Sequence, residues 1–387
     1  MGVVAPVSER DARYERLRNR MQREGYDALL IGGKGHWWTG RGYVRYLSDF
    51  HLWGHDALVL FPVEGEPVLA VNSDAVAGLI ARRGWITDTH GDVFVLPPIL
   101  RALRERKLDR GRLGTVGTPF IISAVTLAEI VAEFPDAQIE PADEVVDGAR
   151  VAKSAFEVRQ NRELWELAKR AVERFAEVLR PGASELELSA EASKIALAGG
   201  ARDILALLGR SSDSYSPPEH VPVRNDDVVR YHMEICGESG HWCELTITLA
   251  FRPVSNDEAR LMQSELDAKE AVRAAAKPGV RVAALAAAFE DVLRSYGWAL
   301  GEPTRHFDFH GQGMDVIEYP WYAAEQPWGS SRDRALEAGA ILSYHPRRNV
   351  VPAVAWSTGI SDNLLITDDG AEWLSGDWDQ RWREVRA

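Results

Sequence analysis

The sequence predicts an α/β N-terminal domain over residues 1–150, followed by an α+β domain over 151–387 built from two pseudo-symmetric halves. Three observations predict this organisation. Strand and helix patterns alternate along the first part of the chain, as expected for helices packed on a sheet. An order of helix, basic-Pro-Gly, helix and glycine occurs twice in the second part. A strictly alternating β-hairpin separates the two occurrences.

The N-terminal domain follows from its elements in chain order. A polar helix from Glu9 to Gly25 leads to the buried strand DALLIGG, after which YVRYLSDF has a strand-like pattern. DALVLFP and EPVLAV are predicted strands, a helix follows from Ala75 to Arg83, and two further α/β units complete the domain. The loop after YVRYL carries His51, Trp53 and His55, which is also typical of an ordinary polar loop with an aromatic anchor.

Two related halves are predicted by the repeated helix grammar. In the first half, a helix over 163–179 stops at Pro181-Gly182, and the next helix opens with a Ser184/Glu187 capping box. In the second half, a helix opened by a Ser255/Glu258 capping box stops at Pro278-Gly279, 97 residues after the first Pro-Gly pair. A site shared by two such halves is expected at their interface. The alternative is that basic-Pro-Gly is simply a common helix stop.

The hairpin from Asp227 to Phe251 carries the first candidate site. If Glu234 lies opposite Glu244, then His232 lies opposite Thr246 and the loop is Gly237 to His241. Two carboxylates and one imidazole then share one face and need a positive charge nearby, for which a divalent metal is the commonest choice. A register slip of one residue would move Glu244 to the far face. The alternative is the solvated polar face of an edge hairpin.

Charge and composition exclude several classes of partner. The 387 residues carry a formal net charge of −13 and a pI of about 5.3, which argues against nucleic acid or an anionic membrane surface. We find no apolar run long enough to span a membrane and no signal-peptide pattern. The two cysteines, Cys236 and Cys243, fall on opposite faces of the hairpin, so we expect no disulfide. Free thiols fit a reducing cytoplasm.

Three stretches near the C-terminal end carry further candidates. HGQGMDVIEYP contains His310, Asp315 and Glu318, and the glycines beside its glutamine permit close backbone approach. ALEAGAILSYHP predicts a strand that ends at His345. ISDNLLITDDG predicts a strand and a tight turn, with Ser361 at its start. A single histidine in such a stretch is more often structural than a ligand.

The order and spacing of these motifs resemble the pita-bread family, which includes creatinase, aminopeptidase P and prolidase. The N-terminal part resembles the first domain of the family through DALLIGG, YVRYLSDF and DALVLFP. HGQG and EYP resemble the motif of its ligand histidine, GAILSYHP its GMxxxxEP motif, and ISDNLLITDDG its xEDxxxVTxxG motif. The resemblance covers nearly the whole chain and implies a creatinase-like N-terminal domain and a pita-bread catalytic domain.

The resemblance also implies a ligand set, which this chain has altered. Metal-dependent members use Asp, Asp, His, Glu and Glu around one metal pair. Carried over position by position, His232 and Glu244 replace the two aspartates, and the histidine is retained as His310. His345 and Ser361 replace the two glutamates.

Other members of the fold match different positions. A second histidine of the peptidases is Ile317 here, and the catalytic histidine of metal-free creatinase lines up with Tyr215. The dimethylsulfoniopropionate lyases of this fold are locally more similar. Their two liganding acids, two residues apart on the first arm, fall on His232 and Glu234.

Ligand-type side chains at four of the five positions predict that metal binding persists in altered form. We expect one divalent transition metal ion, Zn, Fe or Mn, because histidines in place of acids lower the negative charge and suit a softer ion. Ser361 cannot bridge a second ion. A metal-free site is the alternative. The predicted metal ligands are His232, Glu234, Glu244, His310 and His345.

These departures predict a non-peptidase enzyme, a hydrolase or lyase that cleaves a C–N, C–S or C–O bond of a small polar or aromatic metabolite. The predicted proton-transfer residues are Glu318, Tyr215 and Asp315. By resemblance to creatinase-like homodimers, the predicted substrate-binding residues are His51, Trp53, His55 and Trp321. The alternatives are a metal-free amidinohydrolase resembling creatinase, an Xaa-Pro dipeptidase, and a non-catalytic binding protein derived from a peptidase.

Overall fold

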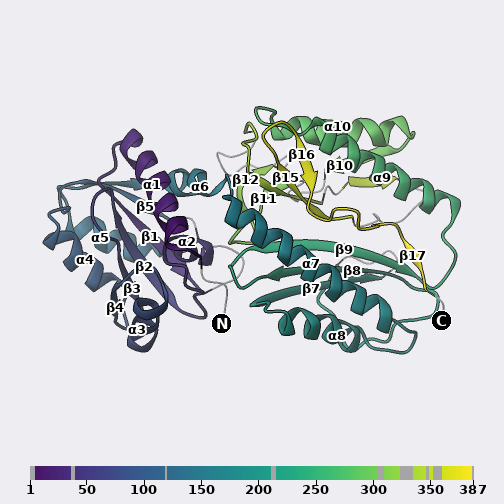
Figure 1. Cartoon of the computed structure of the whole chain (residues 1–387), viewed down its shortest axis with the longest axis horizontal. Coiled ribbons are helices and arrows are strands. Elements are labelled where there is room, and N and C mark those ends of the chain that lie inside the picture. The colour runs from purple at the N-terminus through teal and green to yellow at the C-terminus, as the bar shows by residue number, and fades with distance from the viewer. Residues whose placement is uncertain are drawn as a thin grey trace. The chain divides into compact units, whose positions relative to one another are not determined.

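The computed structural model describes residues 5–35, 40–117, 120–210, 215–303, 309–322, 334–345, 348–351 and 360–385. The contacts divide the chain into two compact units, whose elements are labelled in Figure 1. The first unit comprises Met1–Arg150 together with Gly313–Glu318, and the second comprises Val151–Gln312 and Tyr319–Ala387. Within the described residues, no helix is long and apolar enough to cross a membrane.

The first unit is a six-stranded mixed sheet with helices on both faces. The strand order is β4-β3-β2-β1-β5-β6, with β1 antiparallel to β2 and parallel to β5. Alternate residues of β1 enter two separate apolar clusters, because successive side chains of a strand point to opposite faces. The strands are Ala28–Lys34 (β1), Asp56–Pro62 (β2), Val68–Val71 (β3), Asp88–Gly91 (β4), Arg112–Val116 (β5) and Gln138–Pro141 (β6). The helices are Val7–Glu24 (α1), Arg41–Ser48 (α2), Asp74–Arg83 (α3), Leu96–Glu105 (α4), Ala124–Glu133 (α5) and Asp143–Arg150 (α6).

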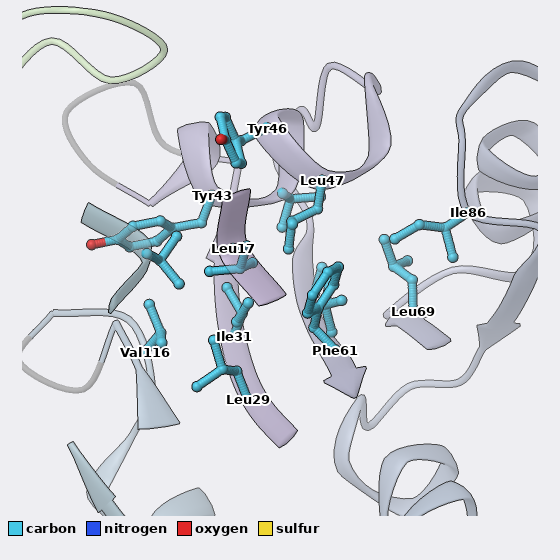
Figure 2. Packing of buried hydrophobic residues seen from close by; sticks show 14 of the residues in the cluster. Leu17, Leu29, Ile31, Tyr43, Tyr46, Leu47, Phe61, Leu69, Ile86 and Val116 are labelled. Carbon is cyan, nitrogen blue, oxygen red and sulfur yellow. The ribbon is translucent and has the colours of Figure 1, made fainter. Parts of the chain in front are cut away.

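The strand-like prediction for YVRYL is wrong, because these residues lie in helix α2. Tyr43, Val44 and Leu47 recur at helical spacing and are all buried in the larger apolar cluster of the unit. Figure 2 shows Tyr43 and Leu47 in that cluster. The polar residues Arg41 and Arg45 are four residues apart, which places them on one face of α2, and this spacing was an available helical signal. The prediction missed it because it considered YVRYL alone, which is too short to show a helical period.

Among its described residues, the second unit has two main sheets and four helices. The four-stranded sheet has the order β17-β9-β8-β7, the five-stranded sheet has the order β12-β11-β13-β15-β16, and β10 pairs with β14. The helices are Ala155–Val178 (α7), Glu185–Ala198 (α8), Asn256–Ala275 (α9) and Val282–Ser295 (α10). The strands of the first sheet are Asp203–Arg210 (β7), Val228–Cys236 (β8), Trp242–Ala250 (β9) and Arg383–Glu384 (β17). The others are Ala299–Pro303 (β10), Phe309–Gly311 (β11), Glu318–Tyr322 (β12), Ile341–Tyr344 (β13), Arg348–Val351 (β14), Asp362–Ile366 (β15) and Ala371–Trp373 (β16).

The predicted helix grammar is confirmed. Capping boxes are present at Ser184/Glu187 and at Ser255/Glu258. Gly182 and Gly279 have φ values of 85° and 86°, a left-handed conformation that glycine adopts without a steric penalty. The first helix starts earlier than predicted, because a third capping box, Ser154/Glu157, opens α7.

The predicted register of the hairpin is also confirmed, with Glu234 opposite Glu244 and His232 opposite Thr246. The edge-hairpin alternative is wrong, because β8 lies between β7 and β9 in the sheet. The odd-numbered residues of β8 and β9 pack with α7 and α8 in one apolar cluster. The even-numbered residues therefore lie on the opposite face. Cys236 and Cys243 are buried free thiols, as predicted.

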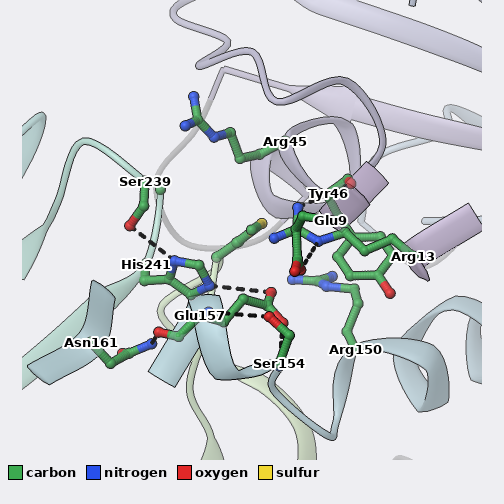
Figure 3. A network of polar contacts seen from close by, with 12 residues as sticks. Glu9, Arg13, Arg45, Tyr46, Arg150, Ser154, Glu157, Asn161, Ser239 and His241 are labelled. Carbon is green, nitrogen blue, oxygen red and sulfur yellow. Dashed lines mark hydrogen bonds and ion pairs between the residues drawn. The ribbon is translucent and has the colours of Figure 1, made fainter. Parts of the chain in front are cut away.

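A buried polar network fixes the turn of the hairpin to the start of α7 (Figure 3). His241 Nδ1 lies 3.0 Å from Ser239 Oγ, and His241 Nε2 lies 3.3 Å from Glu157 Oε1. The other carboxylate oxygen of Glu157 accepts a hydrogen bond from the backbone N–H of Ser154 at 2.9 Å. The acid that caps the helix thus also anchors the hairpin, which restrains the strands that carry the candidate site.

Candidate metal centre

The polar face of the β8–β9 hairpin is buried. His232, Glu234, Glu244 and Thr246 are each at most 7% exposed. His232 Nε2 lies 3.1 Å from Glu234 Oε1 on the same strand face. Burying two carboxylates close together is costly unless a positive charge accompanies them.

The second half of the unit adds two imidazoles. His310 lies on β11 and His345 follows β13 directly, and their Nε2 atoms are 3.0 Å apart. His345 Nε2 lies 3.7 Å from Glu244 Oε1. The structure therefore forms two groups of three residues that share Glu244. Within each group, one ligand atom from each residue lies within 4.8 Å of the others. The groups are Glu244, His310 and His345, and His232, Glu234 and Glu244.

This donor set fits a divalent transition metal. Ligand atoms about 2.0–2.1 Å from one tetrahedral zinc ion lie about 3.3 Å from each other, close to the 3.0 and 3.7 Å separations around His345. His310 Nδ1 lies 2.9 Å from the carbonyl oxygen of Gly311, and an N–H there directs the Nε2 lone pair at the cluster. Glu234 Oε2 is buried and has no hydrogen-bond partner among the described residues. A cation would satisfy that oxygen.

Ser361 does not supply a carboxylate to this cluster. Its hydroxyl lies 2.6 Å from Thr246 Oγ1, which in turn lies 2.9 Å from His232 Nδ1. The sequence analysis assigned no role to either hydroxyl. The alternation of β9 was an available signal, because it places Thr246 on the same face as Glu244.

Comparison with known proteins assigns the fold. The profile of Metallopeptidase family M24 matches residues 159–368, more than half of the chain, and the Creatinase/Prolidase N-terminal domain profile matches residues 13–152.

The chain belongs to metallopeptidase family M24.

Relatives that match the chain along most of its length include proteins named as dipeptidases, and also an ectoine hydrolase of Halomonas elongata that is 23% identical and covers 93% of this chain and 93% of its own. The dipeptidase-like protein YkvY of Bacillus subtilis is 25% identical over 368 residues, which cover 93% of this chain and 96% of YkvY. The crystal structure of dipeptidase PepE from Mycobacterium ulcerans has a TM-score of 0.82 at 20% identity and covers 100% of both chains. That of an Xaa-Pro dipeptidase from Bacillus anthracis has a TM-score of 0.79 at 19% identity and covers 97% of this chain and 100% of its own. At these identities the structural likeness shows the shared pita-bread fold.

The M24 relatives contradict the predicted non-peptidase hydrolase or lyase and favour the dipeptidase alternative. Members of the family use divalent metals such as Mn or Zn. The prediction failed because it took the altered ligand pattern, and above all the serine at position 361, to mean that peptidase chemistry was lost. It did expect the remaining donors to share one cation, and in the structure they form two groups that share Glu244.

Two predicted proton-transfer residues lie in the first unit of this M24 chain. Asp315 and Glu318 form a buried ion cluster with Arg150, in which Arg150 is 2.8 Å from Asp315 Oδ2. The backbone N–H of Gly42 donates to Asp315 Oδ1 at 2.9 Å. Burial raises the pKa of Asp315 above its usual range, and Arg150 opposes part of that shift. The sequence analysis missed Arg150. This residue ends the N-terminal segment of the first unit and is far from the HGQG motif in the sequence.

The third, Tyr215, lies in the second unit near the ligands. Its ring centroid is 5.9 Å from that of His232, and the guanidinium of Arg230 lies 4.9 Å from the Tyr215 ring centroid. Arg230 is buried on the same strand as His232.

The predicted substrate-binding residues occupy separate places. In the first unit, Trp53 is 46% exposed, its ring contacts that of His55 at 5.4 Å, and His51 Nε2 lies 3.3 Å from an Arg41 nitrogen. Trp321 belongs to β12 in the second unit, and its side chain lies outside the part that the structure describes.

Proposed function

We propose that this chain is a metal-dependent dipeptidase that hydrolyses Xaa-Pro dipeptides. The observation that supports this function most directly is the convergence of Glu244, His310 and His345 within 4.8 Å. This convergence occurs in the fold of family M24, and relatives of the chain are named as dipeptidases.

Five side chains would hold the cation, from both halves of the second unit: His232, Glu234, Glu244, His310 and His345. A bound divalent ion there would polarise the scissile carbonyl and acidify the attacking water. We propose one ion, because a serine at position 361 adds no bridging carboxylate. Glu244 belongs to both ligand groups and is therefore the central ligand.

Side chains of the protein would then accept and donate the protons of the reaction. Glu234 Oε1, which lies 3.1 Å from His232 Nε2, would accept a proton, while the buried Oε2 binds the cation. Tyr215 would donate to the leaving amine, because its phenol lies beside His232. Glu318 and Asp315 stay candidates for proton transfer. Glu318 Oε1 accepts the backbone N–H of Met314 at 2.6 Å, and Arg150 pairs with it as well.

We further propose that the enzyme works as a cytoplasmic homodimer on a small-molecule substrate. His51, Trp53, His55 and Trp321 would contribute to substrate binding. The exposed indole of Trp53 supports this role, since it packs against Phe50 at a ring distance of 5.7 Å yet keeps 46% of its surface exposed.

The test is hydrolysis of Ala-Pro and Gly-Pro by protein stripped with chelator and reloaded with Zn²⁺, Mn²⁺ or Fe²⁺. We expect turnover only after reloading, and a loss of about 100-fold or more in His310→Ala and His345→Ala. Ala-Ala and Gly-Gly serve as matched substrates for the proline preference. Metal-loaded protein that leaves all four dipeptides intact would refute the function.

A further inference from the structure

We propose that Thr246 and Ser361 form a hydroxyl pair that positions His232, so that its Nε2 lone pair faces Glu234 and the cation. They are positioning residues, since neither is expected to touch substrate. The inference rests on the proposed metal-dependent function, which it deepens by explaining what occupies the position of the missing carboxylate.

The contacts form a continuous chain from Ser361 to the imidazole. Ser361 Oγ lies 2.6 Å from Thr246 Oγ1 and 3.4 Å from His232 Nδ1, and Thr246 Oγ1 lies 2.9 Å from the same nitrogen. Thr246 is 4% exposed and Ser361 is 2% exposed. Two buried hydroxyls therefore contact Nδ1, while Nε2 points at Glu234.

The second half of the unit holds Ser361 firmly. Gln380 Nε2 donates to the carbonyl oxygen of Ser361 at 3.0 Å, and Lys269 donates to Gln380 Oε1 at 2.7 Å. Lys269 also pairs with the adjacent Asp362 at 2.6 Å. These contacts fix the backbone of Ser361 and Asp362 at the start of β15, next to Thr246.

Hydroxyls suit this position because a hydroxyl can both donate and accept. A neutral imidazole that binds a cation through Nε2 carries its proton on Nδ1 and needs an acceptor there. Without a cation, Nε2–H donates to Glu234 and Nδ1 needs a donor. Thr246 meets either requirement by rotating its O–H, with Ser361 as the second partner. A carboxylate at position 361 could only accept.

The matched test compares zinc affinity in metal-stripped protein. The variants are Thr246→Val and Ser361→Ala, which keep size nearly constant and remove the hydroxyl, and Thr246→Ser, which keeps it. Thr248→Val is the control, because Thr248 is equally buried two residues further along β9. Zn²⁺ is titrated against a chromophoric chelator with no peptide present.

We expect Thr246→Val and Ser361→Ala each to weaken zinc binding by about 10-fold or more, as for other groups that orient a ligand histidine. The double variant should lose little more than Thr246→Val, because the two hydroxyls act in series. Thr246→Ser and Thr248→Val should bind zinc as the wild type does.

Long-range ¹H–¹⁵N spectra of ¹⁵N-histidine protein give a second readout. In the zinc-loaded wild type, the His232 signal, assigned with His232→Gln, should show a protonated Nδ1. Thr246→Val should broaden or shift it.

Three results would overturn the proposal. They are unchanged affinity in both hydroxyl variants, an equal loss in Thr248→Val, and a wild type that binds no zinc. The proposed function is tested separately by the dipeptidase assay. A chain that binds zinc as described but cleaves no dipeptide would contradict only the proposed function.

Discussion

The two halves of the second unit use the same backbone devices at equivalent places. Each half opens with a helix that carries a capping box and ends before a Pro-Gly pair. The backbone N–H of Gly182 donates to the Val223 carbonyl at 2.8 Å, and that of Gly279 donates to the Leu336 carbonyl at 2.9 Å. A repeated local sequence has therefore produced a repeated hydrogen-bond pattern.

The side chains that the halves direct at the metal centre differ. The first half supplies both carboxylates and one imidazole from the two nine-residue strands β8 and β9. The second half supplies His310, His345 and the hydroxyl of Ser361 around strands of three to five residues. The backbone framework is duplicated, whereas the ligand set is complementary. The full ligand set therefore draws on both halves, although His232, Glu234 and Glu244 of the first half already form a group of their own.

The largest expected effect comes from the ligand that both groups share. Glu244→Gln should lower zinc affinity and dipeptide turnover by about 1,000-fold, because it removes a charged donor from both groups at once. Glu234→Gln is the comparison, with a smaller loss. Metal content by mass spectrometry and initial rates measure both. A Glu244→Gln protein that keeps its metal would break the argument that Glu244 is the central ligand.

The choice of metal should depend on imidazoles from both halves. His232→Asp and His345→Glu each restore the acid of the family pattern, one in each half. Each should raise the affinity for Mn²⁺ relative to Zn²⁺ by about 10-fold, since harder oxygen ligands suit Mn²⁺. Competition for the two ions, read by metal analysis, tests this. A shift in only one variant would show that one half decides metal selectivity.

The two Pro-Gly helix stops are equivalent, which predicts that substituting Gly182 or Gly279 lowers the free energy of unfolding by the same amount. Neither glycine has a heavy atom within 4 Å of an added Cβ, so Ala meets only the backbone penalty of a positive φ. Gly182→Ala and Gly279→Ala should each lower the free energy of unfolding by about 1 kcal/mol. Urea denaturation measures the change, and Gly→Asn variants should cost less. Clearly unequal losses would contradict the symmetry of the two stops.

The smallest effect that we expect distinguishes α7 from α9, the first helix of each half. In α9, the Arg252 guanidinium lowers the pKa of the capping Glu258 to about 2, whereas the capping Glu157 of α7 faces His241. A lowered pKa adds stability above the unfolded value near 4.5, and this is lost as the pH falls toward 2. Arg252→Gln should therefore cost up to about 1 kcal/mol at pH 7 and less below pH 4. A cost that is constant between pH 7 and pH 3 would exclude this origin.

Features encoded by local spacing were predictable from the sequence. The hairpin register followed from alternation and loop length, which together placed Glu234 opposite Glu244. The Ser184 and Ser255 caps followed from serine and glutamate three residues apart. Helix α2 was missed although Arg41, Arg45 and Ser48 are spaced as on one helical face, because the short stretch YVRYL taken alone does not show that period.

Contacts between distant segments could not be derived from spacing. The resemblance located position 361 and showed that its acid was missing, but the pairing of Ser361 with Thr246 depends on how two sheets meet. The ion cluster of Arg150 with Asp315 and Glu318 likewise joins residues more than 160 positions apart. Replaced ligands misled the functional prediction for a different reason, because a changed set of residue types does not by itself show that the reaction has changed.

The six residues Gly313–Glu318 belong to the first unit, although the chain on either side of them belongs to the second. A gene fragment that begins at residue 151 would still encode this segment, but without the guanidinium that neutralises Asp315 and Glu318. The segment also carries Met314, which packs in the apolar cluster of the first unit. Dissection at the boundary would leave two orphaned acids and an exposed thioether between β11 and β12. A fragment that begins at residue 151 would therefore have to accommodate both acids without Arg150, and it should be less stable than the same residues within the full chain.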